Sequence, residues 1–81
     1  MAEKTDPADA AGWAKVVQAL RDQGHKFPHA FIASQIEQSR QSVIAWKAVP
    51  IVHVAKLSKL SGIPRHKILP HTLKKMKELL L

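Results

Sequence analysis

Cysteine and tyrosine are both absent from the 81 residues, and aromatic side chains make up only 5% of the chain. Without cysteine there can be no disulfide bond, no thiolate ligand for zinc and no thiol nucleophile. Apolar residues nevertheless account for 46% of the sequence. We therefore expect a small core built from aliphatic side chains, and the lack of cysteine fits a reducing cytoplasm.

Long apolar runs are missing as well. No segment approaches the roughly 18 consecutive apolar residues of a membrane span. The first ten residues, MAEKTDPADA, lack the apolar stretch of a signal peptide. The sequence thus predicts a soluble protein of the cytoplasm.

Acidic residues are scarce, with six Asp and Glu against 13 Lys and Arg, and the net charge is +7. The imbalance is uneven along the chain. Residues 1–22 carry three basic and four acidic side chains, a balance of −1, whereas the remainder carries ten basic and two acidic side chains, a balance of +8. This asymmetry favours a polyanionic partner, either nucleic acid or an anionic membrane surface.

The first helix is predicted from a cap, a periodic stripe and a stop. Asp6 followed by Pro7 is typical of an N-cap with proline at the first helical position. Gly24 is typical of a C-terminal stop. Between them, apolar side chains recur at helical spacing: Trp13, Val16, Val17 and Leu20. Gly12 weakens the early part of this helix.

A second helix is predicted to begin at Pro28, to face the core with Ile32, Ala33 and Ile36, and to end near Gln38. Ser39 is a good N-cap, so a third helix over residues 39–49 can follow after a tight turn. At 100° per residue, one side of this third helix carries Val43, Trp46 and Pro50 toward the core. The opposite side presents Gln41, Ile44, Ala45 and Ala48.

Pro50 separates the third helix from a fourth, which resumes helical spacing at Ile51 and includes Val54, Ala55 and Leu57 before Gly62. The proline-rich stretch GIPRHKILP is expected to be a packed connector. A last helix carries an apolar stripe among lysines, made of Leu73, Met76, Leu79 and Leu80. We therefore predict an all-α fold of about five helices, with residues 1–5 as a flexible N-terminus and residues 6–81 as a single helix-turn-helix domain.

Two short helices joined tightly, the second with one buried and one polar face, are the parts of a helix-turn-helix. From about residue 13 to residue 71, the order VIAWK, VP, HVAKLSKLSG, IPRH and LP resembles the phage Cro-type and YdaS-like regulators of the lambda-repressor-like group. This resemblance implies a bundle of about five helices that binds operator DNA and regulates transcription as a repressor, commonly as a dimer.

Three positions depart from the family's pattern. Glu37 stands where the turn normally has glycine, Gln38 stands where it normally has an apolar residue, and His71 stands where an acidic residue often follows the second proline. A standard turn would require Glu37 to adopt a left-handed backbone conformation, which disfavours residues with a side chain.

The presented face of the third helix matches the chemistry of base edges in the major groove. Arginine bonds bidentately to guanine, glutamine to adenine, and an apolar side chain contacts a thymine methyl group, the roles we expect for Arg40, Gln41 and Ile44. By the positions of the motif, the remaining contacts to phosphates or base edges are expected from Ser39, Ser42, His29, Lys47 and Ala45.

Other functions have less support in the sequence. His25 and His29 have i, i+4 spacing, but they fall in a predicted loop and no carboxylate pair completes a metal site. No catalytic set or phosphate-binding loop is present, so we expect no enzyme, cofactor or small-molecule substrate. The main alternative is a basic amphipathic membrane-surface or protein-partner-binding module formed by HTLKKMKELLL. RNA ranks lower because few aromatic side chains are available for base stacking.

Overall fold

The computed structural model describes residues 6–80. The predicted flexible segment, residues 1–5, lies outside the described residues. Within them the all-α prediction is confirmed, with six α-helices, one 3₁₀ helix and no strand. In chain order these are α1 (Pro7–Asp22), α2 (Pro28–Ile36), α3 (Arg40–Ile44), η1 (Ile51–His53), α4 (Val54–Ser61), α5 (Arg65–Ile68) and α6 (Pro70–Leu80). The sixth α-helix arises because the proline-rich connector contains the single turn of α5.

Both ends of α1 follow the predicted local signals. The Asp6 carboxylate accepts a hydrogen bond of 2.8 Å from the Ala8 backbone N–H, and Pro7 begins the helix. At the other end Gly24 has φ +103°, and the His25 N–H donates to the Leu20 carbonyl at 3.1 Å. This bond back across six residues, with glycine in the left-handed region, is the Schellman pattern that ends helices.

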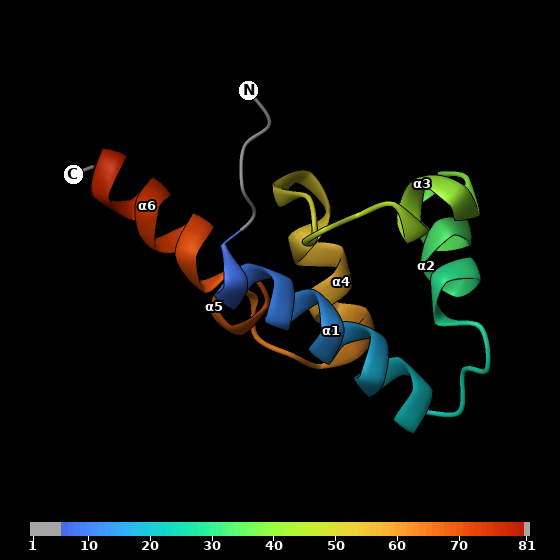
Figure 1. Cartoon of the computed structure of the whole chain (residues 1–81). Helices are drawn as coiled ribbons and strands as arrows, with labels where there is room; N and C mark the ends of the chain where they lie inside the picture. Colours follow the sequence, from blue (N-terminus) through green and yellow to red (C-terminus); the bar gives the residue numbers. More distant parts are fainter. Residues whose placement is uncertain (1–5, 81) are drawn as a thin grey trace.

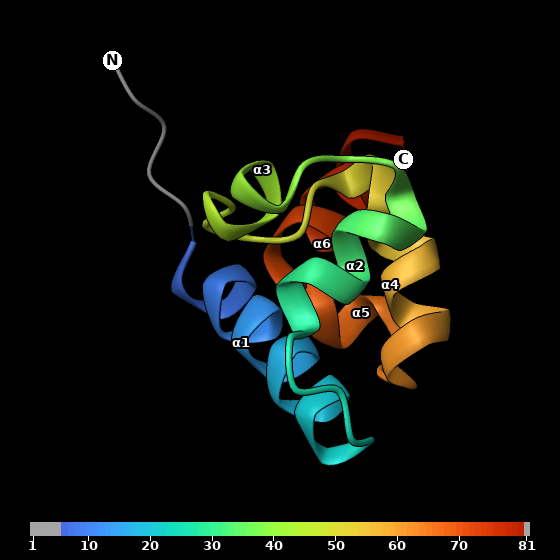
Figure 2. The same ribbon diagram turned by 90° about the vertical axis from the view of Figure 1, so that its right-hand side faces the viewer.

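The core lies where α1 crosses the other helices. Its buried apolar side chains come from almost every element: Trp13, Val16, Leu20, Ile32, Ala33, Val43, Val49, Val54, Leu57, Ile68 and Leu69. In the view of Figure 1, α2 and α3 lie at one end of the molecule, and α6 extends to the opposite end. After a quarter turn, α2 lies toward the viewer and α6 lies behind it (Figure 2).

Gly12 permits the close approach of α1 and α5. The residue is buried, and a Cβ atom placed on it would lie 1.9 Å from the Ile68 carbonyl oxygen and 2.6 Å from the Ile68 carbonyl carbon. Both distances are far shorter than van der Waals contact. Glycine therefore has a packing role here, although its sequence context predicts only a weakened helix.

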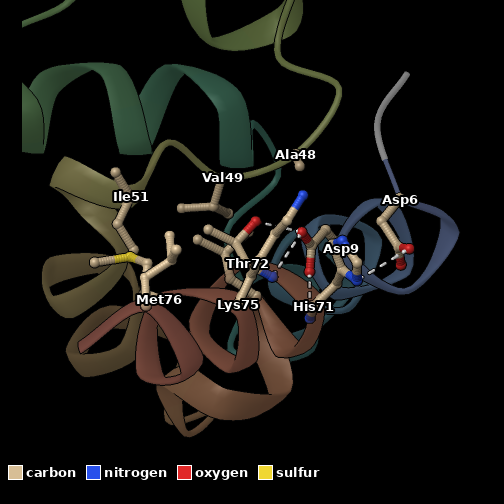
Figure 3. A pocket seen from close by; sticks show the side chains of 11 residues that line it. Asp6, Asp9, Ala48, Val49, Ile51, His71, Thr72, Lys75 and Met76 are labelled. Carbon is tan, nitrogen blue, oxygen red and sulfur yellow. Dashed lines mark hydrogen bonds and ion pairs between the residues drawn. The ribbon is translucent and has the colours of Figure 1, made fainter. Parts of the chain in front are cut away.

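Asp9 joins α1 to the first turn of α6. Its carboxylate is only 3% exposed and accepts hydrogen bonds from the His71 N–H at 2.9 Å, from the Thr72 N–H at 3.3 Å and from the Thr72 hydroxyl at 2.6 Å (Figure 3). The first N–H groups of a helix have no partner within the helix. Asp9 thus caps a helix that lies more than sixty residues further along the chain.

Several apolar residues that recur at helical spacing face solvent. Leu73 is half-buried, but Met76 and Leu79 of the same stripe are exposed, and so are Ile51 and Ala55. Met76 and Leu79 are exposed because α6 continues past the end of the core (Figure 1). None of the helices within residues 6–80 combines the length and the apolar character that a bilayer crossing requires.

Candidate nucleic-acid interface

Three residues, Glu37 to Ser39, connect α2 to α3. Glu37 has φ 58° and ψ 39°, and its N–H donates to the Ala33 carbonyl, as does the N–H of Gln38 at 3.0 Å. Glu37 is therefore in the left-handed conformation that the standard turn requires, despite its side chain. Among residues 6–80 it is the only residue other than glycine with positive φ.

We predict that Glu37→Gly stabilises the protein. A residue with a Cβ pays about 1 kcal/mol for the left-handed conformation, and glycine removes this strain although it also loosens the unfolded chain. The expected result is a gain of up to about 1 kcal/mol in the free energy of unfolding, measured by urea denaturation. Glu37→Gln is the matched control, because it removes the charge and keeps the Cβ. An equal gain in both variants would attribute the effect to charge rather than to the backbone.

The start of α3 agrees with its predicted cap. The Ser39 hydroxyl accepts a hydrogen bond of 3.1 Å from the Ser42 N–H, and the two serine hydroxyls lie 2.8 Å apart. Both side chains remain exposed. The cap thus fixes the first turn of α3 and leaves its outer surface open to a partner.

The predicted helix over residues 39–49 is wrong in its extent, because α3 ends at Ile44. Trp46 donates its N–H to the Val43 carbonyl at 3.1 Å, a bond that tightens the last turn. Val49 is buried, and as the residue before Pro50 it is disfavoured in the helical conformation, so a helix is not expected to run through residue 49. Ala48, expected on the presented face, is half-buried and packs against the core.

Most residues of the predicted interface are exposed. Val43 is fully buried, and Ile44 beside it is 51% exposed. The exposed members of the predicted set are Ser39, Arg40, Gln41, Ser42, Ile44, Ala45 and Lys47, whereas His29 is half-buried. The structure therefore separates a docking side of α3 from a presented side, as its sequence pattern predicts.

A row of four rings supports this helix pair from the protein side. Trp46 packs against Trp13 with ring centroids 5.3 Å apart and stacks on His53 at 5.8 Å. Trp13 in turn meets His29 edge-on at 5.6 Å. His53 and His29 come from different elements, so their places in the row could not be read from local periodicity.

Positive charge gathers around His29 at the start of α2. Burial lowers the pKa of His29 below 6.5, and the charges of Arg21 and Arg40 lower it further. The two arginines are therefore close enough to act on the imidazole. Within residues 6–80 the only close contact between a basic nitrogen and a carboxylate joins His71 and Asp6, at 3.4 Å, so neither arginine has an acidic partner there. Arg21 was missed by the sequence reasoning because it lies in the acidic part of the chain.

The histidines considered for metal binding have other neighbours. The His25 ring stacks on Phe31 with centroids 3.9 Å apart, and His29 packs against Trp13. In the part of the chain that the structure describes, no group of three or more potential ligand side chains is placed to hold a metal ion.

Comparisons of the chain with protein-family models, with curated proteins and with solved structures found no match. The fold is all-α, and its α3 is a short, exposed helix with one arginine that follows α2 after a tight turn.

Proposed function

We propose that the chain is a sequence-specific double-stranded DNA-binding regulator of transcription, similar to Cro and acting as a repressor at an operator in the cytoplasm. The observation that carries the proposal is the division of α3: Val43 is fully buried, while Arg40, Gln41 and Ile44 on the same short helix face solvent. A recognition helix needs one side for the protein and another for the major groove.

Base reading is assigned to the three exposed side chains of α3. The guanidinium of Arg40 suits the two acceptors of guanine, the amide of Gln41 suits adenine, and Ile44 suits a thymine methyl group. Backbone phosphates are assigned to residues around them, namely His29, Ser39, Ser42, Lys47 and Arg21, with Ala45 close to the sugar-phosphate edge.

The short α3 is compatible with this role, because the N-terminal residues of a recognition helix make most base contacts. Its five residues nevertheless allow few contacts in one half-site. Two copies on a twofold operator would double that number. The proposal therefore includes a homodimer on DNA.

One observation favours a second function, that of a module binding a membrane surface or a protein partner. Met76 and Leu79 are exposed on α6 beside three lysines, Lys74, Lys75 and Lys77. Basic amphipathic helices of this kind bind anionic surfaces. This reading ranks second because it leaves the exposed face of α3 without a role.

Selection of duplexes from a random pool, at one stated salt concentration, tests the proposal directly. We expect one sequence to be enriched, and Arg40→Ala and Gln41→Ala each to lose about 1 to 3 kcal/mol on it. Each variant should also relax the preference at one base position per half-site. Binding to a scrambled duplex should fall much less.

Arg65→Ala is the matched control, since it removes an exposed arginine from α5, which lies away from α2 and α3 (Figure 1). It should leave the base preference unchanged. Raising the salt concentration should weaken binding with a log-log slope of about −0.9 per phosphate contacted. If Arg40→Ala and Gln41→Ala lost equal affinity for both duplexes, these residues would not read bases. If no duplex were enriched, the second function would be favoured.

A further inference from the structure

A groove of about 740 Å³ lies between α4 and α6. One wall comes from η1 and α4, and the other from Leu73 and Met76 of α6. Arg65 and His66, at the start of α5, also line it. None of these residues belongs to the interface assigned to DNA. We call this feature the α4–α6 groove.

The wall on the side of α4 has the spacing of a helix face. It consists of Ile51, Val54, Ala55 and Ser58, at positions i, i+3, i+4 and i+7. The Ser58 hydroxyl already donates a hydrogen bond of 2.7 Å to the Ile63 carbonyl, so this wall has no hydroxyl hydrogen left for a ligand. The same bond places Ser58 beside the segment that leads to Arg65. The wall therefore offers apolar contacts along its length and reaches positive charge at its Ser58 end.

The groove has a core floor and apolar edges that face water. Val54 is buried and Leu73 is half-buried, whereas Ile51 is 39% exposed and Met76 is 41% exposed. Ile51 and Met76 lie side by side in Figure 3, and both also line the neighbouring hollow beside Asp9. A partner that covers these edges would remove apolar surface from water, which favours binding.

The charge around the groove has a single sign. Residues 38–77 contain nine Lys and Arg and no Asp or Glu. Besides Arg65, two exposed lysines flank the walls: Lys59 follows Ala55 by four residues, and Lys77 follows Leu73 by four. Residues four apart lie on the same side of a helix. None of these three cations has a carboxylate partner within residues 6–80.

We propose that the α4–α6 groove binds an amphipathic helix of a partner protein, with an apolar side and an acidic polar side. The apolar side chains of that helix enter the groove, and its carboxylates pair with Arg65, Lys59 and Lys77. Helices bind in apolar grooves through anchors at i, i+3 or i+4, and i+7. These anchors span about 10 Å at 1.5 Å per residue, close to the length of the wall from Ile51 to Ser58.

Other occupants suit the groove less well. A second copy of this chain supplies no acidic helix, because Asp6 and Asp9 are bonded within the domain and the acidic residues beyond them are far apart in the sequence. A bilayer is contacted by apolar side chains that project, whereas these residues line a hollow between two helices. DNA would satisfy the cations and leave the apolar walls uncovered. An acidic amphipathic helix satisfies both.

A designed peptide tests the proposal with the full chain in the absence of DNA. The probe is a fluorescein-labelled helix of about fifteen residues with leucines on one side and glutamates on the other. We expect saturable binding by fluorescence anisotropy. A peptide of the same composition with scrambled order, and one with lysine in place of glutamate, should each bind about tenfold more weakly or worse.

Ala55→Asp tests the groove itself. It places a carboxylate on the exposed part of the wall and should weaken binding of the acidic peptide about tenfold or more. Phe27→Asp is the matched control, since it makes the same change of charge at a residue that is 69% exposed and outside the groove, and it should bind like wild type. Circular dichroism should show equal helix content in all three proteins.

Arg65→Glu tests the pairing of charges. It should weaken binding about tenfold, whereas Lys67→Glu, an equal change on α5 outside the groove, should weaken it by less than about threefold. Amide NMR signals that move on binding should belong to α4 and α6.

Several results would overturn the proposal. These are no saturable binding of the acidic peptide, equal binding of the scrambled peptide, wild-type affinity in Ala55→Asp, or NMR shifts confined to Arg40 and Lys47, which would mean that the peptide occupies the α3 surface. Flotation with phosphatidylserine vesicles that Ala55→Asp abolishes, without peptide binding, would assign the groove to a membrane instead. The inference goes beyond the proposed function and does not rest on it. Failure of DNA recognition would appear in the duplex selection, which uses no peptide, so the two proposals can fail separately.

Discussion

Gly12→Ala is expected to lower the free energy of unfolding by about 3 kcal/mol or more and to leave little folded protein at 37 °C. On an exposed helix the same substitution stabilises by about 1 kcal/mol, because alanine is the better helix former. Here the new Cβ would lie 1.9 Å from the backbone oxygen of Ile68. A backbone atom cannot rotate aside, so α1 and α5 would have to move apart.

Urea unfolding followed by circular dichroism measures this effect. Ala11→Gly is the matched control, because Ala11 is the exposed neighbour of Gly12 on the same helix. It should cost about 1 kcal/mol through helix propensity alone. If Gly12→Ala raised the unfolding midpoint, helix propensity would outweigh packing at this position and the close approach of α1 and α5 would be disproved.

Trp46→Ala should cost about 3 kcal/mol, a large share of the stability of so small a domain. Trp46 is half-buried, but its ring contacts both Trp13 and His53. It follows directly after the five-residue α3, whose only buried residue is Val43. Removal of the ring would therefore leave the presented helix held by one side chain and its cap.

Trp46→Ala should lower the unfolding midpoint, whereas Ile44→Ala should change the free energy of unfolding by less than about 0.5 kcal/mol. Ile44 is the control because it lies two residues away and is half exposed. Trp46→Phe should retain most of the stability, since it keeps a ring against Trp13. An unchanged midpoint in Trp46→Ala together with lost DNA binding would mean that Trp46 contacts DNA rather than holding α3 against the core.

Helix ends with strong local signals were predicted from the sequence. Asp6 and Ser39 cap the helices they were expected to cap, and Gly24 and Gly62 follow helix ends with positive φ. Such signals act within a few residues, so a single sequence contains them. The exposed face of α3 could also be predicted, because its periodicity distinguishes Val43 from Ile44.

Features that depend on distant parts of the chain could not be predicted. The role of Gly12 depends on the path of α5, and the charged neighbours of His29 include Arg21 at the end of α1. The apolar stripe of α6 has helical spacing whether its outer half meets the core or extends beyond it. Helical spacing shows which side of a helix is apolar, but it does not show which part of the protein, if any, packs against that side.

The hydrogen bonds of Asp9 also bear on the order of folding during synthesis. The carboxylate is made 62 residues before the first of its backbone donors, His71. While the chain is being translated, α1 therefore has no partner for this group, which stays hydrated, and the surface that α5 and α6 will cover stays open to water. Contacts between such distant residues form only after the chain between them has been made. The bonds that join Asp9 to the first turn of α6 therefore cannot form until residues 71 and 72 have left the ribosome.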